Sequence, residues 1–259
     1  MPDKKYKYIY GPVSSWRLGS SLGVDPISGE KKVCTFDCVY CQIGDTKRFS
    51  SKREVFVPTG DIIKEIKSLP ELNIDYITFS GTGEPALVSN LGEIIKEIRK
   101  LRKEKIAIIT NSSLIDRKDV QEDLGLADLV MLKLDAHSPE LFLKINKPLK
   151  GITFDRVLKG IKEFSSGYKG KLALQIMFIE KNRSYAGDIA GLAKDINPDE
   201  VQLNTPLRPC SAKPLSKKEM DAIKLYFKGM RVVCVYDARK KKVEFINRDD
   251  TSRRRGSHD

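Results

Sequence analysis

The segment Asp75-Tyr-Ile-Thr-Phe-Ser-Gly-Thr-Gly-Glu84 passes from β-branched and aromatic residues into a turn that contains two glycines. Such side chains favour extended backbone and glycines interrupt it, so the pattern predicts a strand over residues 75–80. Residues 91–102 follow with apolar side chains at helical spacing. A buried strand followed by an amphipathic helix is the repeating unit of α/β folds.

The same alternation extends in both directions along the chain and predicts six strand–helix units. The other predicted strands are 21–25, 105–110, 129–135, 171–179 and 200–205, and the other predicted helices are 61–67, 117–124, 154–164, 185–194 and 216–228. Near-continuous apolar strands that alternate with helices indicate a parallel sheet covered by helices. We therefore predict an α/β fold, a partial (βα)6 TIM-like barrel over residues 21–228.

Two short extensions flank the predicted barrel. Residues 1–20 are polar and aromatic and are expected to form an N-terminal extension. Residues 229–259 are expected to form a strand pair, 231–236 with 243–246, followed by a basic tail. In barrels of this kind the active site lies where the strands end, and polar residues gather at those ends here.

Three cysteines within eight residues, Cys34-Thr-Phe-Asp-Cys38-Val-Tyr-Cys41, point to a metal site. A closed zinc site needs four ligands, and neither histidine, His137 or His258, is near this cluster in the sequence. Zinc would need a distant fourth ligand such as Cys210 or Cys234. Three thiolates suit a [4Fe–4S] cluster better, provided that one iron takes a ligand from outside the protein.

The spacing C-x3-C-x2-C, with an aromatic residue before the third cysteine, resembles the signature of the radical S-adenosylmethionine (SAM) superfamily. The resemblance covers roughly residues 11–209 and implies a partial barrel of the radical SAM type. It also implies that SAM chelates the open iron and is cleaved to a 5′-deoxyadenosyl radical. An electron donor such as flavodoxin or ferredoxin is implied as a partner. Whether SAM is consumed or regenerated stays open.

The resemblance also implies a set of SAM contacts. Gly81-Thr-Gly-Glu84 resembles the family's glycine–glutamate element, in which the carboxylate pairs with the amino group of SAM. Lys133 and Asp135 lie two apart on a strand, so both face one side, as SAM contacts or as an interior salt bridge. The complete set of expected SAM contacts is Tyr40, Gly81, Thr82, Gly83, Glu84, Asn111, Ser112, Lys133, Asp135, Gln175 and Asn204.

Two further segments, 11–25 and 204–209, resemble a compact group related to the wyosine-forming tRNA synthase. That enzyme carries a second cluster on three cysteines upstream of the first, whereas no cysteine precedes Cys34 here. The resemblance therefore implies tRNA as a substrate but not wyosine chemistry. Arg17 and Arg208 are the candidate anchors for an anionic substrate. Cys210 is a tentative substrate contact or a bystander, and Cys234 is expected in the core.

The composition bounds the other classes of function. The chain has 259 residues and a net charge of +12, and residues 239–259 carry eight Lys or Arg against four Asp or Glu. Such a charge suits an RNA partner, although a lysine- and glutamate-rich, heat-adapted surface would also explain it. No apolar run approaches the roughly 20 residues of a membrane span, so we expect no membrane partner and a cytoplasmic location.

Three hypotheses follow from these observations. The first is a radical SAM enzyme that modifies RNA, specifically tRNA. The second is a radical SAM enzyme that modifies or activates a protein, a peptide or a small metabolite. The third is a zinc-stabilised binding module without catalysis. The oligomeric state is not determined by these patterns.

Overall fold

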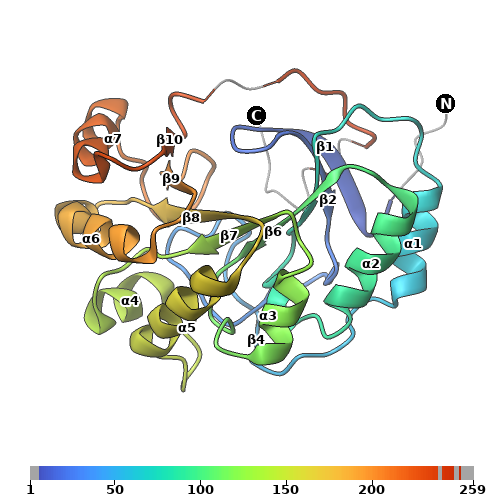
Figure 1. The fold of residues 1–259 in the computed structure, drawn as a ribbon, viewed down its shortest axis with the longest axis horizontal. Coiled ribbons are helices and arrows are strands. Elements are labelled where there is room, and N and C mark those ends of the chain that lie inside the picture. Colours follow the sequence, from blue (N-terminus) through green and yellow to red (C-terminus); the bar gives the residue numbers. More distant parts are fainter. Residues whose placement is uncertain (1–5, 239–240, 248–250, 252–259) are drawn as a thin grey trace.

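A computed structural model describes residues 6–238, 241–247 and 251 of the chain. One curled sheet of eight strands forms its centre, in the order β1-β2-β5-β6-β7-β8-β9-β10 (Figure 1). The strands are β1 Ile9–Ser15, β2 Gly19–Val24, β5 Tyr76–Phe79, β6 Lys105–Thr110, β7 Leu129–Lys133, β8 Lys171–Met177, β9 Glu200–Asn204 and β10 Val232–Cys234. All neighbours from β2 to β10 pair in parallel, which confirms the α/β partial barrel.

Helices cover the outer, convex face of the sheet (Figure 1). They are α1 Thr59–Lys67, α2 Leu91–Leu101, α3 Lys118–Leu124, α4 Pro139–Asn146, α5 Phe154–Gly167, α6 Ala186–Ile196 and α7 Lys217–Lys224, with the 3₁₀ turns η1 Pro85–Leu87, η2 Arg183–Tyr185 and η3 Leu225–Phe227. The apolar stripe of α2, Ile94, Ile95 and Ile98, is fully buried. Each such side chain contributes about 1.5–3 kcal/mol when it leaves water.

The inner, concave face of the sheet changes from apolar to polar along the strands. Met131 and Ala173 belong to a small apolar cluster that is separate from the main core. Two residues further along the same strands, Lys133 and Gln175 are register partners on the same face. The concave face is therefore filled at one end and carries polar groups where the strands end.

Several elements were not expected from the sequence, among them β1 and α4. β1 pairs antiparallel with β2 and adds a strand to the sheet within the expected extension. Its segment contains Gly11-Pro12 and lacks the alternation of a half-buried strand. The helix α4 was also missed, although Ser138 accepts a hydrogen bond from the Leu141 amide as its N-cap.

The expected C-terminal strand pair was wrong. β10 extends the parallel sheet beside β9, and within the described residues 241–247 no strand forms opposite it. Instead, the Ile246 amide donates to the carbonyl of Gly11, so this segment returns to β1. The reason is that β9 leaves an open parallel edge, which a short apolar run can extend. Most of the basic tail lies outside the described residues.

Among the described residues, no helix is both long and apolar enough to cross a bilayer.

Candidate functional site

The loop that carries the three cysteines is fixed on one side to the turn after β5. Its short strand β3, Val33–Cys34, pairs in parallel with β4, Arg48–Phe49. The Val33 amide donates to the Thr82 carbonyl over 3.2 Å, and the Glu84 amide donates to the Val33 carbonyl over 3.1 Å. A Cβ atom on Gly83 would stand 1.9 Å from the Val33 oxygen, so this contact requires glycine.

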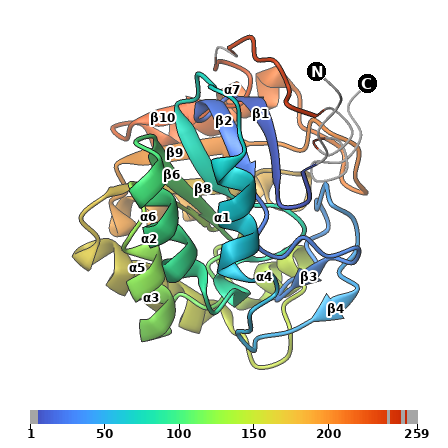
Figure 2. The ribbon, with the colours of Figure 1, turned by 90° about the vertical axis from the view of Figure 1, so that its right-hand side faces the viewer.

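The other side of the cysteine loop rests on the end of α4. The Asp37 amide donates to the Asn146 carbonyl over 3.0 Å, and the Val39 amide donates to the Ile145 carbonyl over 2.9 Å. The loop and its two short strands lie beside α4 in the second view (Figure 2). The cysteines are thus held between two distant parts of the chain.

All three thiols line one cavity of about 340 Å³ where the parallel strands end. Burial raises the pKa of Cys34 to about 12 and that of Cys38 to about 11, and the nearby carboxylates of Glu84 and Asp135 add to the respective shifts. Burial lowers the pKa of Lys32, but the thiolates of Cys41, Cys34 and Cys38 outweigh that effect and the net shift is upward. A bound metal ion would displace the protons of these thiols.

The arrangement of these thiols fits a cluster of several metal ions. Cys34, Cys38 and Cys41 face the same cavity, and each thiolate of an iron–sulfur cluster binds a different iron. The donor set of three thiols around a cavity therefore suits the cluster.

Glu84 lies buried at the wall of the cavity, after β5. Its Oε1 accepts from the Ala86 amide over 3.0 Å and from the Thr110 hydroxyl over 2.6 Å, and its Oε2 accepts from the Asn111 amide over 2.7 Å. Burial raises the pKa of this carboxyl, and the hydrogen bonds act against that shift. A carboxylate has about four acceptor positions, so one remains for a ligand.

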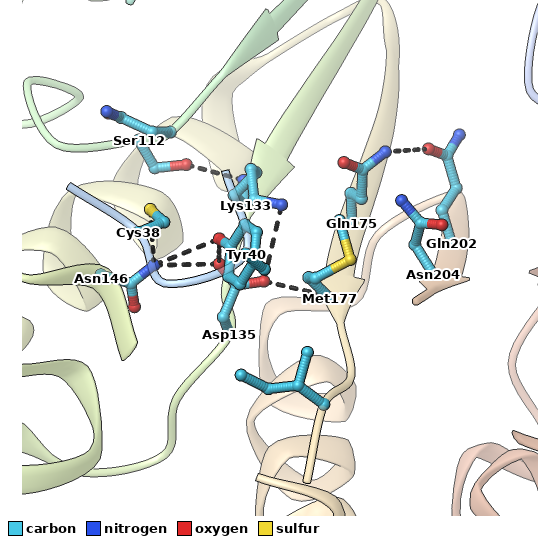
Figure 3. Close-up of polar contacts among 12 residues, drawn as sticks. Cys38, Tyr40, Ser112, Lys133, Asp135, Asn146, Gln175, Met177, Gln202 and Asn204 are labelled. Atoms are coloured by element: carbon cyan, nitrogen blue, oxygen red, sulfur yellow. Dashed lines mark hydrogen bonds and ion pairs between the residues drawn. The ribbon is translucent and has the colours of Figure 1, made fainter. Parts of the chain in front are cut away.

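Tyr40, which lines the cavity, belongs to a buried polar network (Figure 3). Its hydroxyl donates to Asp135 Oδ2, which also accepts from Asn146 Nδ2 over 3.0 Å. The Lys133 ammonium lies 4.7 Å from the centre of the Tyr40 ring and 3.7 Å from Asp135 Oδ1. The interior salt bridge between Lys133 and Asp135 is therefore present, while Lys133 also lines the cavity.

The floor of the cavity is formed by amide side chains on β8 and β9. Gln175 Nε2 donates to Gln202 Oε1 over 3.3 Å, and Asn204 stands beside them at the end of β9 (Figure 3). Gln202 in turn donates to Glu200 over 2.9 Å. Gln175 and Asn204 line the cavity, whereas Gln202 lies beneath them.

Two arginines also line the cavity. The Arg17 guanidinium lies 4.7 Å from the centre of the Trp16 ring, in the turn between β1 and β2. Arg208 Nε donates to Gln42 Oε1 over 2.8 Å, which ties the segment after β9 to the cysteine loop.

Most of the sequence-derived residues come together. The residues that line the cavity are Arg17, Cys34, Cys38, Tyr40, Cys41, Gly81, Gly83, Glu84, Asn111, Lys133, Gln175, Asn204 and Arg208. Thr82, Ser112, Asp135 and Cys210 do not line it. Thr82 faces Asp25, Ser112 accepts from the Lys133 amide, and the Cys210 thiol donates to the Ala212 carbonyl. Cys234 is buried, as expected, and His137 stacks on Tyr185.

Sequence reasoning missed Lys32, Trp16 and Asn146. Lys32 could have been noticed, because a lysine two residues before Cys34 must lie near the metal site. Trp16 is the single tryptophan of the chain and stands beside Arg17. Asn146 gave no signal, because it contacts Cys38 across 108 residues of sequence.

Comparison with known proteins agrees with this fold. A match to the family described as "Radical SAM superfamily" covers residues 32–192. A UPF0026 protein of Synechocystis sp. is 42% identical over 211 residues, which are 81% of this chain and 78% of that protein. A probable GTP 3′,8-cyclase of Saccharolobus solfataricus is 30% identical over 200 residues, which are 74% of this chain and 59% of that protein.

Solved structures share the fold at low sequence identity. SuiB of Streptococcus suis bound to S-adenosylmethionine superposes with a TM-score of 0.62 and 15% identity, over 79% of this chain and 48% of that chain. Archaeal TYW1 superposes with a TM-score of 0.58 and 14% identity, over 81% of this chain and 72% of that chain. The chain thus spans about half the length of SuiB.

Proposed function

The chain belongs to the radical SAM superfamily and, within it, to the UPF0026 family, and from that premise we propose that it modifies RNA, specifically tRNA. The chain is a radical SAM enzyme, and the cofactors of that family are a [4Fe–4S] cluster and SAM. Bound together, these cofactors supply a 5′-deoxyadenosyl radical that abstracts hydrogen from a substrate. The residues of the chain bind, orient and enclose the reactants.

The proposed roles follow from the walls of the cavity. Cys34, Cys38 and Cys41 are the proposed cluster ligands. The proposed SAM contacts are Tyr40, Gly81, Gly83, Glu84, Asn111, Lys133, Gln175 and Asn204, all of which line the cavity. Thr82, Ser112 and Asp135 lie behind these residues, and we assign them a supporting role. In this scheme the remaining acceptor position of Glu84 receives the ammonium of SAM, because a buried carboxylate favours a charged donor.

The observation that carries the substrate class is the charge of the cavity. Of the described residues that line it, four are cationic, Arg17, Lys32, Lys133 and Arg208, and one is a carboxylate, Glu84. Glu84 is already bound by three donors. Lys32 and Lys133 lie 3.8 Å and 3.7 Å from the carboxylates of Asp37 and Asp135, so Arg17 and Arg208 are the cations that we assign to an anionic ligand beyond SAM. Both arginines line the cavity, and a guanidinium group matches the geometry of a phosphate.

A nucleotide would use the neighbouring aromatic group as well. Trp16 lies under the Arg17 guanidinium, and a base can stack on either plane. The net charge of +12 favours a long polyanion over a single nucleotide, because each neutralised phosphate releases counterions. These two features together support RNA.

The single tryptophan allows a direct test of this proposal. Bulk tRNA is titrated into the anaerobically reconstituted enzyme while the fluorescence of Trp16 is followed, and 5′-deoxyadenosine release is measured in parallel. We expect tRNA to change the fluorescence and to stimulate release several-fold, while heparin does neither. A tRNA affinity no better than that of heparin at physiological salt, without stimulation, would reject the RNA proposal.

A small phosphate-bearing metabolite is the second candidate. It is favoured by the 30% identity to a probable GTP 3′,8-cyclase, whose substrate is a single nucleotide by its name. In the same titration, a nucleoside triphosphate that stimulates release where tRNA does not would select this candidate.

We also propose a one-electron donor protein, flavodoxin or ferredoxin, as a partner. The five cysteines are free thiols in the structure, which suits a reducing compartment such as the cytoplasm. Reduction of the enzyme by either purified carrier, followed by loss of its visible absorbance, tests this partner.

A further inference from the structure

Three nitrogen-bearing side chains from different parts of the fold stand around the three cysteine thiols. Asn111, at the end of β6, points its Nδ2 at Cys34 Sγ over 3.5 Å. Asn146, at the end of α4, points its Nδ2 at Cys38 Sγ over 3.5 Å (Figure 3). Lys32, before β3, lines the cavity together with Cys41. Polar nitrogen groups from three parts of the chain around these sulfurs are an arrangement that burial alone does not require.

The two asparagine donors are held in place by other contacts. Asn111 Nδ2 also donates to the Thr35 hydroxyl over 2.7 Å, and its Oδ1 accepts from the Ser113 amide over 3.0 Å. Asn146 Nδ2 donates to Asp135 Oδ2 over 3.0 Å. Because a carboxylate only accepts, Asp135 fixes which end of the Asn146 amide faces it and therefore faces Cys38.

The orientation of Asn146 has a cost that suggests a purpose. Its Oδ1 is buried and has no hydrogen-bond partner among the described residues. An unsatisfied buried acceptor destabilises the fold, so the contacts of the amide nitrogen must offset this cost. The amide nitrogen is therefore kept for what it contacts, which is Cys38, Tyr40 and Asp135.

Lys32 supplies a full positive charge on the third side. Its side chain is 6% exposed and lies 3.8 Å from the carboxylate of Asp37. Its ammonium also donates to the Gly44 carbonyl over 2.9 Å, in the loop that follows Cys41. In such a poorly solvated position a charge acts on its neighbours more strongly than it would in water.

We propose that Lys32, Asn111 and Asn146 raise the reduction potential of the cluster that the three cysteines hold. Reduction adds one electron from an external one-electron carrier, which is oxidised, and no covalent bond forms or breaks. Hydrogen bonds and positive charge directed at the ligand sulfurs stabilise the more negative, reduced form. The inference rests on the proposed function only in placing the cluster on Cys34, Cys38 and Cys41.

The test is a redox titration of the reconstituted protein, followed by electron paramagnetic resonance without SAM or substrate. For Lys32→Met we expect the equilibrium constant for reduction to fall about tenfold, which is about 59 mV for one electron. Asn146→Leu should lower it about threefold, because it removes a dipole rather than a charge. Lys32→Arg keeps the charge and should stay near the parent potential.

Asn90→Leu is the matched control for loss of a buried amide. Asn90 donates to the Val57 carbonyl and the Thr59 hydroxyl and does not line the cavity, so its loss should leave the potential unchanged. Parent-like potentials in both Lys32→Met and Asn146→Leu, with full iron content, would overturn the proposal.

Loss of iron from a variant, and failure of the RNA proposal, can each be told apart from failure of this proposal. If Lys32→Met retains no iron, the uncharged donor variant Lys32→Gln decides: a lowered potential supports the proposal and an unchanged one rejects it. Failure of the RNA proposal is seen separately, because the titration contains neither SAM nor tRNA.

Discussion

Two parts of the cavity wall carry different kinds of side chain. In the first part, Tyr40, Asp135 and Asn146 are buried and bonded to one another, and Glu84 accepts three hydrogen bonds. In the second part, formed by the β1–β2 turn and the segment after β9, Arg17 lies over Trp16 and Arg208 is hydrogen-bonded to Gln42. The first part resembles a preorganised cofactor site. The second part presents cations and an aromatic plane to a larger ligand.

The largest expected effect is on the three cysteines, in the first part of the cavity wall. Cys34→Ala, Cys38→Ala and Cys41→Ala should each abolish iron binding and the brown absorbance, because two thiolates cannot hold the cluster. Iron and sulfide analysis after anaerobic reconstitution measures this. Cys234→Ala, a buried thiol outside the cavity, should retain both signals. Stoichiometric zinc without iron in the parent would contradict the assignment.

Gly83→Ala should disrupt the contact between the turn after β5 and the cysteine loop. The added Cβ meets the Val33 carbonyl at 1.9 Å, so the β5 turn must separate from the cysteine loop. We expect a loss of about 3 kcal/mol in the free energy of unfolding, as for other overpacked sites, measured by urea titration. Gly191→Ala, in α6 with open space around it, should instead gain about 0.5–1 kcal/mol. Equal effects of the two substitutions would refute the steric argument.

Glu84→Gln separates the binding of SAM from the binding of iron. It keeps the volume of the side chain but removes the charge proposed to meet an ammonium. The dissociation constant for SAM should rise about 30-fold, or about 2 kcal/mol, in calorimetry, while iron content hardly changes. Unaltered SAM affinity would mean that the glycine–glutamate element has another role.

Arg208→Glu tests the second, cationic part of the wall. Reversal of this charge should weaken tRNA binding about tenfold, or about 1.4 kcal/mol, and lower turnover at every salt concentration. The slope of affinity against salt should decrease by about one, because roughly one phosphate contact is lost. Filter binding at several salt concentrations measures both. An unchanged slope would remove Arg208 from the substrate contacts.

The smallest effect is expected from the tail. Deletion of residues 248–259, which removes a cluster of arginines, should make the salt dependence of tRNA binding shallower. Turnover should persist, because phosphate contacts position a substrate without specifying it. Loss of turnover in the truncated protein at low salt would show that the tail takes part in the reaction.

The sequence predicted the features that depend on local patterns better than those that depend on distant contacts. The six barrel strands follow from apolar runs that alternate with amphipathic helices. Lys133 was found because strand periodicity puts it on one face with Asp135, whereas Gln175 was found from the family resemblance. Asn146 could not be found, because it sits on an unpredicted helix and reaches Cys38 across 108 residues. β10 was assigned to the wrong partner, because pairing depends on which sheet edge is open and not on the strand itself.

The double support of the cysteine loop sets an order of events for maturation. Cys38 leaves the ribosome 108 residues before Asn146, and at ordinary synthesis rates that delay is roughly 5–20 s. During this interval the end of α4 has not yet been made, so the thiols are still solvated and mobile. The nascent chain must complete more than half of its length before the metal pocket can close.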